Sequence, residues 1–395
     1  MIREGLKNEI MDMKEWLVCV RRDLHMYPEL GLEENRTSTM IKKYLDNMNI
    51  EYETYEGQTS VVGIIRGAYP GKTIAIRADM DALPILEKND VVYKSKNHGV
   101  MHACGHDAHT TILLGAGKIL NSIKHELHGN IKLLFQPAEE TVGGADRMVK
   151  AGCMENPKVD YVIGLHVMPN HPCGIIETKY GALNGASDGI SITIRGRQAH
   201  GAYPDLGVDA IAIAGQVITA LQNVVSRNVS PLDSAVLTLG TIKGGVKGNV
   251  IADEVKITGT LRTINPNTRR NVKERIKAIV TDIAESFDGE GKVEFEEGYA
   301  ALINSSEVVE EIISTVKENF GEEALVIKEM PSLGVEDFSY FIDAAKGAFY
   351  HLGCGNVEKN ITAPLHNECF DIDEDCLPLG VLTHTLIALR LLEKK

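Results

Sequence analysis

The sequence predicts an α/β protein in which a smaller domain of βαββαβ order interrupts a larger α/β domain. Three observations predict this class. Short runs rich in β-branched residues alternate with helical patterns from the N-terminus to Leu165. The middle of the chain then follows the order strand, helix, strand, strand, helix, strand, which is the ferredoxin-like pattern. Helix and strand segments resume after residue 297, so the larger domain is expected to be discontinuous.

The larger domain is expected to begin with two helices, at 16–24 and 33–48, where apolar residues recur at helical spacing. A third helix is expected over Ile112–Ile123, where apolar side chains share one face. The strands of this domain are short apolar runs at Val61–Ile65, Thr73–Ile76, Ile131–Phe135 and Tyr161–Leu165.

The inserted domain is predicted at 185–297, which leaves 1–184 and 298–395 for the larger domain. Its helices are expected at about 208–225 and 268–287. Its strands are expected at Gly189–Arg195, Ala235–Ile242, Glu254–Leu261 and Lys292–Glu296. A glycine-containing stretch at 181–189 is interpreted as a loose connection that could act as a hinge.

Composition excludes several function classes. The 395 residues carry 41 Lys and Arg against 55 Asp and Glu, a net charge of −14, which argues against binding to nucleic acid or an anionic membrane. The seven cysteines include no CxxC pair, so a disulfide framework is not expected. No apolar segment near the first residues suggests a signal peptide, and no apolar run approaches the ~18 residues that span a bilayer. A soluble, cytoplasmic protein is expected.

The densest chemical signal is the run HACGHDAH at residues 102–109. Cys104 and His106 are two residues apart, so their side chains would point the same way in an extended segment. Thiolate and imidazole are preferred ligands of zinc-like metals. The alternative is a polar loop with incidental histidines, and features elsewhere in the chain decide between the two.

Three later motifs favour a metal site. Glu139 and Glu140 follow a strand, and adjacent glutamates can point in different directions, so one could bind metal while the other acts as a general base. His166 ends another strand, and His366 lies near the C-terminus. Each motif alone has an ordinary structural explanation. Together they supply enough ligands for a pair of metal ions.

Six segments resemble the M20 metallopeptidase family: RRDLHMYPELGLEE, RADMDALP, GVMHACGHDAHTTILLGA, LLFQPAEE, GLHV and PLHNECFD. The branch that they resemble contains hippurate hydrolases, N-acyl-amino-acid amidohydrolases (aminoacylases), N-acetyldiaminopimelate deacetylases and auxin-conjugate hydrolases. The resemblance extends from about residue 15 to residue 380. It implies a two-metal catalytic domain interrupted by a ferredoxin-like lid or dimerisation domain, which matches the order of elements above.

The resemblance also implies roles for individual residues of the larger domain. Glu139 would be the general base. The wider family has an HxD motif where this chain has Asp79-Met80-Asp81, so the ligand histidine is absent and Asp81 keeps the place of the orienting carboxylate. The metal ligands would be Cys104, His106, Glu140, His166 and His366.

In the inserted domain, the resemblance implies that His200 stabilises the tetrahedral intermediate, in some relatives across a dimer interface. Asn249 and Arg262 resemble the positions that meet the substrate carboxylate. Arginine suits this role because its planar fork forms two parallel hydrogen bonds with a carboxylate.

The expected reaction is hydrolysis of the amide bond of N-acyl-amino acids, with an N-acetyl or aromatic acyl group. A metal-activated water would attack, with Glu139 as general base. Two divalent ions per subunit are expected, with Zn²⁺ or Mn²⁺ favoured and Co²⁺ or Ni²⁺ as alternatives. The expected partners are a small N-acyl-amino acid and further copies of the chain, bound through the lid domain, but neither nucleic acid nor a membrane.

Three alternatives stay open. The first is a dipeptidase or carboxypeptidase of the same fold, and the second is N-acetyldiaminopimelate deacetylase in lysine biosynthesis. The third is a binding protein that has lost catalysis. This last reading is disfavoured because every expected ligand and the general base are present.

Overall fold

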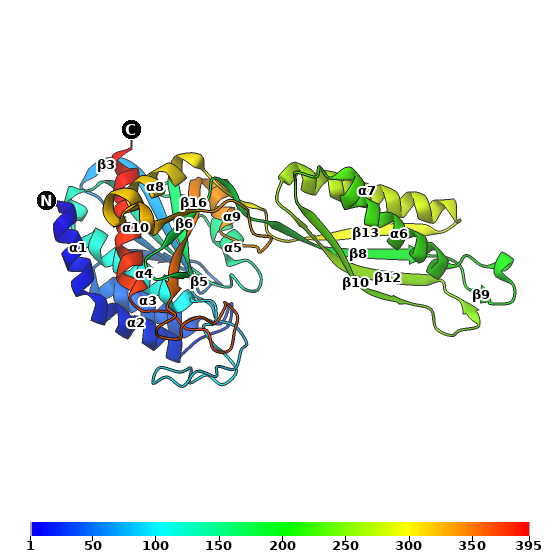
Figure 1. Ribbon diagram of the computed structural model, residues 1–395, viewed down its shortest axis with the longest axis horizontal. Helices are drawn as coiled ribbons and strands as arrows, with labels where there is room; N and C mark the ends of the chain where they lie inside the picture. Colours follow the sequence, from blue (N-terminus) through cyan, green and yellow to red (C-terminus); the bar gives the residue numbers. More distant parts are fainter. Residues whose placement is uncertain (1, 395) are drawn as a thin grey trace. The chain divides into compact units, whose positions relative to one another are not determined.

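The computed structural model describes residues 2–394, so residues 1 and 395 of the predicted larger domain lie outside the described chain. The chain divides into two compact units (Figure 1). The first comprises Met1–Leu183, Ile303–Met330 and Asp337–Lys395, and the second comprises Asn184–Leu302 and Pro331–Glu336. A smaller unit therefore interrupts a discontinuous larger one.

The first unit contains an eight-stranded mixed sheet in the order β1-β2-β4-β3-β5-β16-β6-β15. Its strands are β1 (Glu51–Thr54), β2 (Val61–Arg66), β3 (Tyr69–Asp79), β4 (His128–Gln136), β5 (Tyr161–Pro172), β6 (Ile176–Thr178), β15 (Leu325–Ile327) and β16 (Lys346–Gly355). β3 runs parallel to both β4 and β5, and β16 runs parallel to β5. The carboxyl ends of these central strands therefore meet at one edge of the sheet.

Helices cover this sheet. They are α1 (Ile2–Asp12), α2 (Lys14–Met26), α3 (Asn35–Asn47), α4 (His106–Ser122), α5 (Gly144–Lys150), α8 (Ser306–Phe320), α9 (Ser339–Ala344) and α10 (Cys376–Glu393). α2 buries Leu17, Val20 and Leu24, the face that its periodicity predicts. α4 and α10 pack closely, because a Cβ added at Gly115 would lie 2.6 Å from Val381 Cγ2.

One helix of the described chain, α10, is long and apolar enough to cross a membrane by length and composition alone. α10 is 18 residues long, with a hydropathy of 1.4. However, 78% of it is buried inside the protein, and it packs on α4, α8 and β3. The core of the first unit therefore accounts for its apolar side chains.

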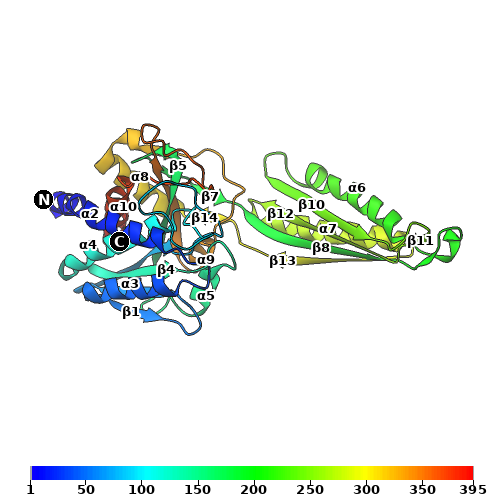
Figure 2. The same cartoon turned by 90° about the horizontal axis from the view of Figure 1, so that it is seen from below.

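The second unit has the ferredoxin-like architecture that the sequence predicts. Its elements are β8 (Ala186–Arg195), α6 (Ala210–Asn228), β10 (Ala235–Gly244), β12 (Glu254–Thr263), α7 (Pro266–Ser286) and β13 (Glu290–Glu297). The strands pair antiparallel in the order β10-β12-β8-β13. Figures 1 and 2 show α6 and α7 together on one face of this sheet.

Local sequence signals explain these elements. Ile190, Ile192 and Ile194 alternate with less buried residues along β8, so every second side chain enters the core. Asp209 caps α6 by accepting hydrogen bonds from two backbone N–H groups, and Asn265 caps α7 by accepting one, from Asn267. Two short strands, β9 (Ala199–His200) and β11 (Val250–Ile251), pair separately.

Two boundary predictions need correction. The sequence predicts residues 184, 298–302 and 331–336 in the larger domain, but they belong to the second unit. Gly185 donates its backbone N–H to Gly334 O at 3.0 Å, and Asn184 bridges to Ser332. Pairing between segments so distant in sequence leaves no local pattern. The stretch 181–189 contains β7 (Gly181–Asn184) and the start of β8, so it is not a loose connection; β7 pairs with β14 (Leu302–Asn304).

Candidate metal centre

The predicted ligands of the first unit gather at one edge of its sheet. Asp81 lies two residues beyond the end of β3, and Glu139 lies three residues beyond the end of β4. His166 lies within β5, which continues past the predicted end at Leu165. His106 is the first residue of α4, and His366 comes from a long loop before α10. Five separate segments thus converge, and three of them are β3, β4 and β5 or follow directly from these strands, as expected for the carboxyl ends of parallel strands.

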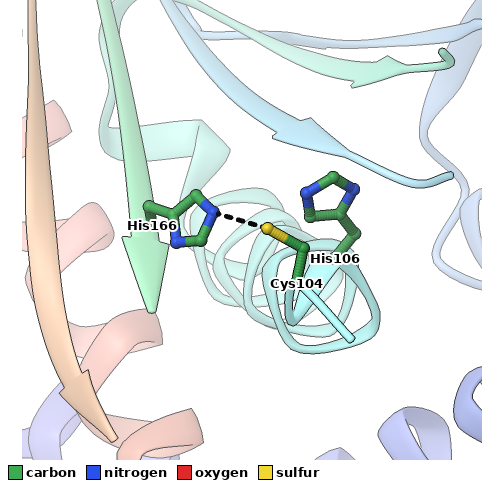
Figure 3. Close-up of side chains that lie close together, drawn as sticks. All are labelled: Cys104, His106 and His166. Carbon is green, nitrogen blue, oxygen red and sulfur yellow. Dashed lines mark hydrogen bonds between the residues drawn. The ribbon is translucent and has the colours of Figure 1, made fainter. Parts of the chain in front are cut away.

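The Cys104 thiol stands at the middle of this group. Cys104 Sγ lies 3.3 Å from His166 Nε2 and 3.3 Å from His366 Nε2. Cys104, His106 and His166 each offer one ligand atom within 4.8 Å of the others. Figure 3 shows the thiol between the two imidazole rings. Sulfur and imidazole nitrogen form a donor set that suits Zn²⁺ and related ions.

Glu140 extends the group on its other side. Its Oε1 lies 3.1 Å from His366 Nε2 and 3.9 Å from His106 Nε2. Cys104, Glu140 and His366 form a second set of ligand atoms within 4.8 Å of one another, and His106, Glu139 and Glu140 form a third. The structure therefore brings all five predicted ligands together in overlapping sets.

One buried atom supports the fit of a cation. His106 Nδ1 lies 3.2 Å from Asp81 Oδ1, to which it donates its proton. The opposite nitrogen, Nε2, is buried without a hydrogen-bond partner and faces Glu140. A buried polar nitrogen without a partner costs free energy unless something binds it. A divalent ion held by these side chains would satisfy this lone pair.

Asp81 orients both His106 and the two neighbouring glutamates, Glu139 and Glu140. Its Oδ1 accepts the backbone N–H of Glu139 at 3.1 Å, and its Oδ2 accepts the N–H of Glu140 at 3.1 Å. One buried carboxylate thus orients a predicted ligand and fixes the turn that carries the predicted base. This geometry fits the orienting role expected for Asp81.

The protonation states of the ligands follow from burial and charge. Burial raises the pKa of the Cys104 thiol, and the neighbouring His106 opposes this only in part. Burial lowers the pKa of His166, so its imidazole is neutral. Burial disfavours the charged form of Glu140, but the hydrogen bond with His366 and the nearby histidines outweigh it and lower its pKa. A bound cation would stabilise the thiolate.

A second cluster, Asp79, His106 and His109, also has ligand-like spacing. The ligand atoms of Asp79 and His109 are already paired, however. Arg77 donates to Asp79 Oδ2 at 2.6 Å, and His109 Nδ1 donates to Asp79 Oδ1 at 2.6 Å. His109 Nε2 then accepts the N–H of Val167 at 2.8 Å. This cluster therefore supports β5 beside His166 rather than forming a further cation site.

Sequence reasoning left His109 without a definite role. A signal for it was present, because His106 and His109 are three residues apart and share one face of α4. The partner Asp79 stands where the wider family has its ligand histidine. Although burial opposes ionisation of Asp79, Arg77 and the histidines hold its pKa well below the usual range. The carboxylate is therefore charged and ties His109 in place.

The three predicted site residues of the second unit lie at two separate positions. His200 and Asn249 lie together on the β9–β11 pair, where Val250 is opposite His200 and Gly201 donates its N–H to Asn249 O at 2.9 Å. Arg262 pairs with Ser187 near the far end of β12. Eight residues of strand separate Arg262 from Glu254, about 26 Å. The structure therefore does not bring Arg262 to His200 and Asn249.

The chain is similar to known proteins over most of its length. The model of peptidase family M20/M25/M40 matches residues 75–390. Thermostable carboxypeptidase 1 of Saccharolobus solfataricus is 38% identical over 395 residues, 99% of this chain and 99% of that protein. N-acetyl-L-cysteine deacetylase of Bacillus subtilis is 41% identical over 366 residues, 92% of this chain and 85% of that protein.

A solved structure is similar over the whole chain. It is a Bacillus subtilis protein described as a dinuclear metal-binding peptidase from the M20 family, with a TM-score of 0.84 and 31% identity. The match covers 98% of this chain and 100% of that one. The predicted fold class and the predicted family are both confirmed. The chain belongs to peptidase family M20/M25/M40, and it is a metal-dependent amidohydrolase.

Proposed function

We propose that the protein hydrolyses N-acyl-amino acids, with an N-acetyl or aromatic acyl group, and releases the free amino acid and a carboxylic acid. The observation that carries this proposal is the convergence of Cys104, His106, Glu140, His166 and His366 beside Glu139. A dinuclear ligand set with an adjacent carboxylate is suited to activating water for attack on an amide.

The names of the relatives support this substrate class and its main alternative. The Bacillus subtilis relative is named as a deacetylase of N-acetyl-L-cysteine, which is an N-acyl-amino acid. The Saccharolobus relative is named as a carboxypeptidase. Another relative, from Bacillus cytotoxicus, is named as N-acetyldiaminopimelate deacetylase. All three activities cut an amide beside a residue that carries a carboxylate.

When bound, two divalent ions would supply an acidified water and polarise the amide carbonyl. The ligand set accepts Zn²⁺ or Mn²⁺, with Co²⁺ and Ni²⁺ as alternatives. The chain's own residues perform the proton chemistry. The Glu139 carboxylate takes a proton from the attacking water and returns it to the nitrogen of the leaving amine. Asp81 fixes the Glu139 backbone, which keeps this carboxylate in place.

In the second unit, His200 is proposed to donate a hydrogen bond to the developing oxyanion. Asn249 or Arg262 is proposed to bind the substrate carboxylate, because their separation in the second unit prevents both from contacting it within one chain. We also propose a cytoplasmic location, supported by seven free cysteines, and a homo-oligomer formed through the second unit. The net charge of −14 supports a small-molecule substrate over nucleic acid or a membrane.

A substrate panel tests the proposal. Metal-free protein reconstituted with Zn²⁺ or Mn²⁺ would be given acetyl-, benzoyl- and aminoacyl-amino acids and N-acetyldiaminopimelate, and amino-acid release would be measured. Preference for the acetyl or benzoyl substrates supports the proposal. Preference for aminoacyl substrates supports the peptidase alternative instead.

The Glu139→Gln variant tests the proposed base. It should keep the bound metal but lose turnover by about 10²–10⁴-fold, because the amide cannot accept a proton. Glu285→Gln is a matched control, since Glu285 is an exposed glutamate of α7 in the second unit, and its turnover should equal that of the wild type. Wild-type turnover in Glu139→Gln would show that Glu139 is not the base.

A further inference from the structure

The segment RRDLH, residues 21–25, contributes no metal ligand, yet its first arginine is fully buried in the first unit. Arg21 Nε donates to Asp107 Oδ2 at 2.8 Å, and neither side chain is exposed. Asp107 directly follows the ligand His106. Asp107 Oδ1 also accepts the N–H of Ala108 at 2.9 Å, which fixes the carboxylate in the first turn of α4. Arg21 is therefore coupled to the segment that carries Cys104 and His106.

The other edge of the same guanidinium reaches a second ligand-bearing segment. Arg21 Nη2 donates to Asp371 Oδ1 at 2.9 Å, and Nη1 lies 3.4 Å from Glu374 Oε1. Both carboxylates follow His366 along the chain. Asp371 is itself held, because its Oδ2 accepts a hydrogen bond from Tyr93 at 2.7 Å. A planar group with several donors can bridge carboxylates in this way, whereas a lysine ammonium cannot.

The two bridged segments also meet directly beside the metal centre. The backbone N–H of His366 donates to Ala103 O at 2.8 Å. His366 has a φ of 62°, a conformation that costs energy for a residue with a side chain. Surrounding contacts must therefore hold His366 where its ring meets Cys104 and Glu140. The hydrogen bonds of Arg21 with Asp107 and Asp371 are such contacts, because they join the same two segments. We call this arrangement the Arg21 bridge.

Removing the guanidinium would leave buried negative charge. Asp107 would keep His25, whose Nδ1 lies 2.7 Å from Asp107 Oδ2, and the backbone N–H of Ala108. Asp371 would keep Tyr93 and the backbone N–H of Ile372, but no cation in hydrogen-bond contact within the described chain. An uncompensated buried carboxylate is strongly destabilising, so the two segments would shift to admit water or to separate the charges. Such a shift would move His366 relative to Cys104.

We propose that Arg21 is a positioning residue of the metal centre, which holds the Cys104–His106 segment and the His366 segment in the spacing that binds metal. The inference rests on the proposed metal centre but not on the proposed substrate. The residue touches neither the ligands' metal-facing atoms nor the reacting groups. Its effect should therefore appear in metal affinity, before any substrate is added.

The test is a competition titration of metal-free protein with Zn²⁺ against a chromogenic chelator. Arg21→Met should bind Zn²⁺ about 10–100-fold more weakly than the wild type, the usual cost of losing a residue that orients metal ligands. The Zn²⁺ affinity of Arg21→Lys should lie between those of the wild type and Arg21→Met, because lysine keeps the positive charge but cannot reproduce the guanidinium bridge. Asp371→Asn, which weakens one arm of the bridge, provides a second variant should Arg21→Met fail to fold, and it should also weaken binding.

Lys132→Met is the matched control. Lys132 is another fully buried cation of the first unit, and its Nζ donates to the carbonyl oxygens of Cys153 and Glu155. Cys153 and Glu155 belong to no ligand-bearing segment. The variant should lower the unfolding temperature but leave Zn²⁺ affinity within about twofold of the wild type, since no outer contact of a ligand is lost.

Two results would overturn the inference. One is wild-type Zn²⁺ affinity in a folded Arg21→Met or Asp371→Asn protein. The other is an equal loss of affinity in Lys132→Met at a matched loss of thermal stability, which would make the effect a general loss of structure. Failure of the wild type to bind Zn²⁺ would contradict the metal centre itself, whereas metal binding without hydrolysis would contradict only the proposed substrate.

Discussion

Asp81 shows how one side chain can serve two parts of a reaction centre. Its two oxygens accept hydrogen bonds from the backbone N–H groups of Glu139 and Glu140, and Oδ1 also accepts a hydrogen bond from His106 Nδ1. The sequence indicates this residue only through the motif Asp79-Met80-Asp81. Arg21, by contrast, could not be assigned a role from sequence. Its partner Asp107 lies 86 positions away and Asp371 lies 350 positions away, so no local spacing connects them.

An isosteric change tests the double role of Asp81. In Asp81→Asn the amide has one acceptor oxygen, so it cannot accept from His106 and from both backbone N–H groups. Metal affinity should fall by about 10–100-fold, and turnover should fall with it. Metal titration and steady-state kinetics would measure both. Unchanged values for both would contradict the orienting role.

Glu34 is a second residue whose role appears only in the structure. It is fully buried, and its Oε1 accepts the N–H of Ala138 at 2.9 Å. Ala138 has a φ of 56° and precedes Glu139, so the acceptor stabilises a costly turn next to the proposed base. Glu34→Ala should lower kcat by about 10-fold or more with a smaller change in KM, because a displaced catalytic group costs rate. Equal kcat in the variant and the wild type would contradict this reading.

Glu177 gives a prediction about pH and stability. Its hydrogen bond with His351, at 2.7 Å, lowers its pKa to about 2 although burial opposes the shift. A carboxyl whose folded pKa lies below the unfolded value of about 4.3 stabilises the protein above that value and loses the effect as pH falls towards 2. Glu177→Gln should therefore be less stable at pH 7, and the difference should shrink below about pH 4. Unfolding midpoints against pH would measure this, and a constant difference would contradict it.

At the scale of elements, the start of α4 decides how the ligands meet. Residues two apart, such as Cys104 and His106, point the same way in an extended segment, but here α4 begins at His106. Gly105 makes the transition with a φ of 84°. A Cβ added there would lie 2.3 Å from Val167 Cγ2. Only glycine allows this close approach, so the thiol and the imidazole converge despite the helical start.

Gly105→Ala tests the close contact between the start of α4 and Val167 of β5. The variant would force a side chain into a left-handed conformation and against Val167, at a cost of about 2–4 kcal/mol in unfolding free energy. Zn²⁺ affinity should fall as well, because Cys104 and His106 flank the residue. Denaturant unfolding and metal titration would measure these effects. Gly152→Ala is a suitable control, since that glycine also has a positive φ but has no atom within 4 Å of the added Cβ.

At the scale of the whole molecule, the βαββαβ insertion was predictable because each of its elements has its own alternating or helical pattern. The placement of the C-terminal strands and loops could not be predicted in this way. β16 lies between β5 and β6 in the sheet, although about 170 residues separate it from both. Similarly, the segment 331–336 joins the second unit by backbone pairing alone. Such long-range placement depends on the completed fold rather than on any periodicity.

The proposed homo-oligomer would be formed through the exposed edge of the sheet in the second unit. β10 is an edge strand of the second unit, and Val236 and Ile242 on it are 43% and 55% exposed. Exposed apolar side chains on an edge strand favour pairing with another chain. Light scattering should give a mass of at least twice the 43.2 kDa of one chain. Ile242→Lys should shift the mass towards one chain, whereas a monomeric wild type would contradict the oligomer.

The central claim is that the converging ligands form a two-metal centre that hydrolyses amides. The most direct test is to count the Zn²⁺ or Mn²⁺ ions that bind to metal-free wild-type protein while measuring amino-acid release from an N-acetyl-amino acid. The account predicts two ions per chain, and hydrolysis that is absent without metal and restored as the ions bind. A folded protein that binds no ion at saturation, or that hydrolyses the substrate equally well in the presence of excess chelator, would contradict it.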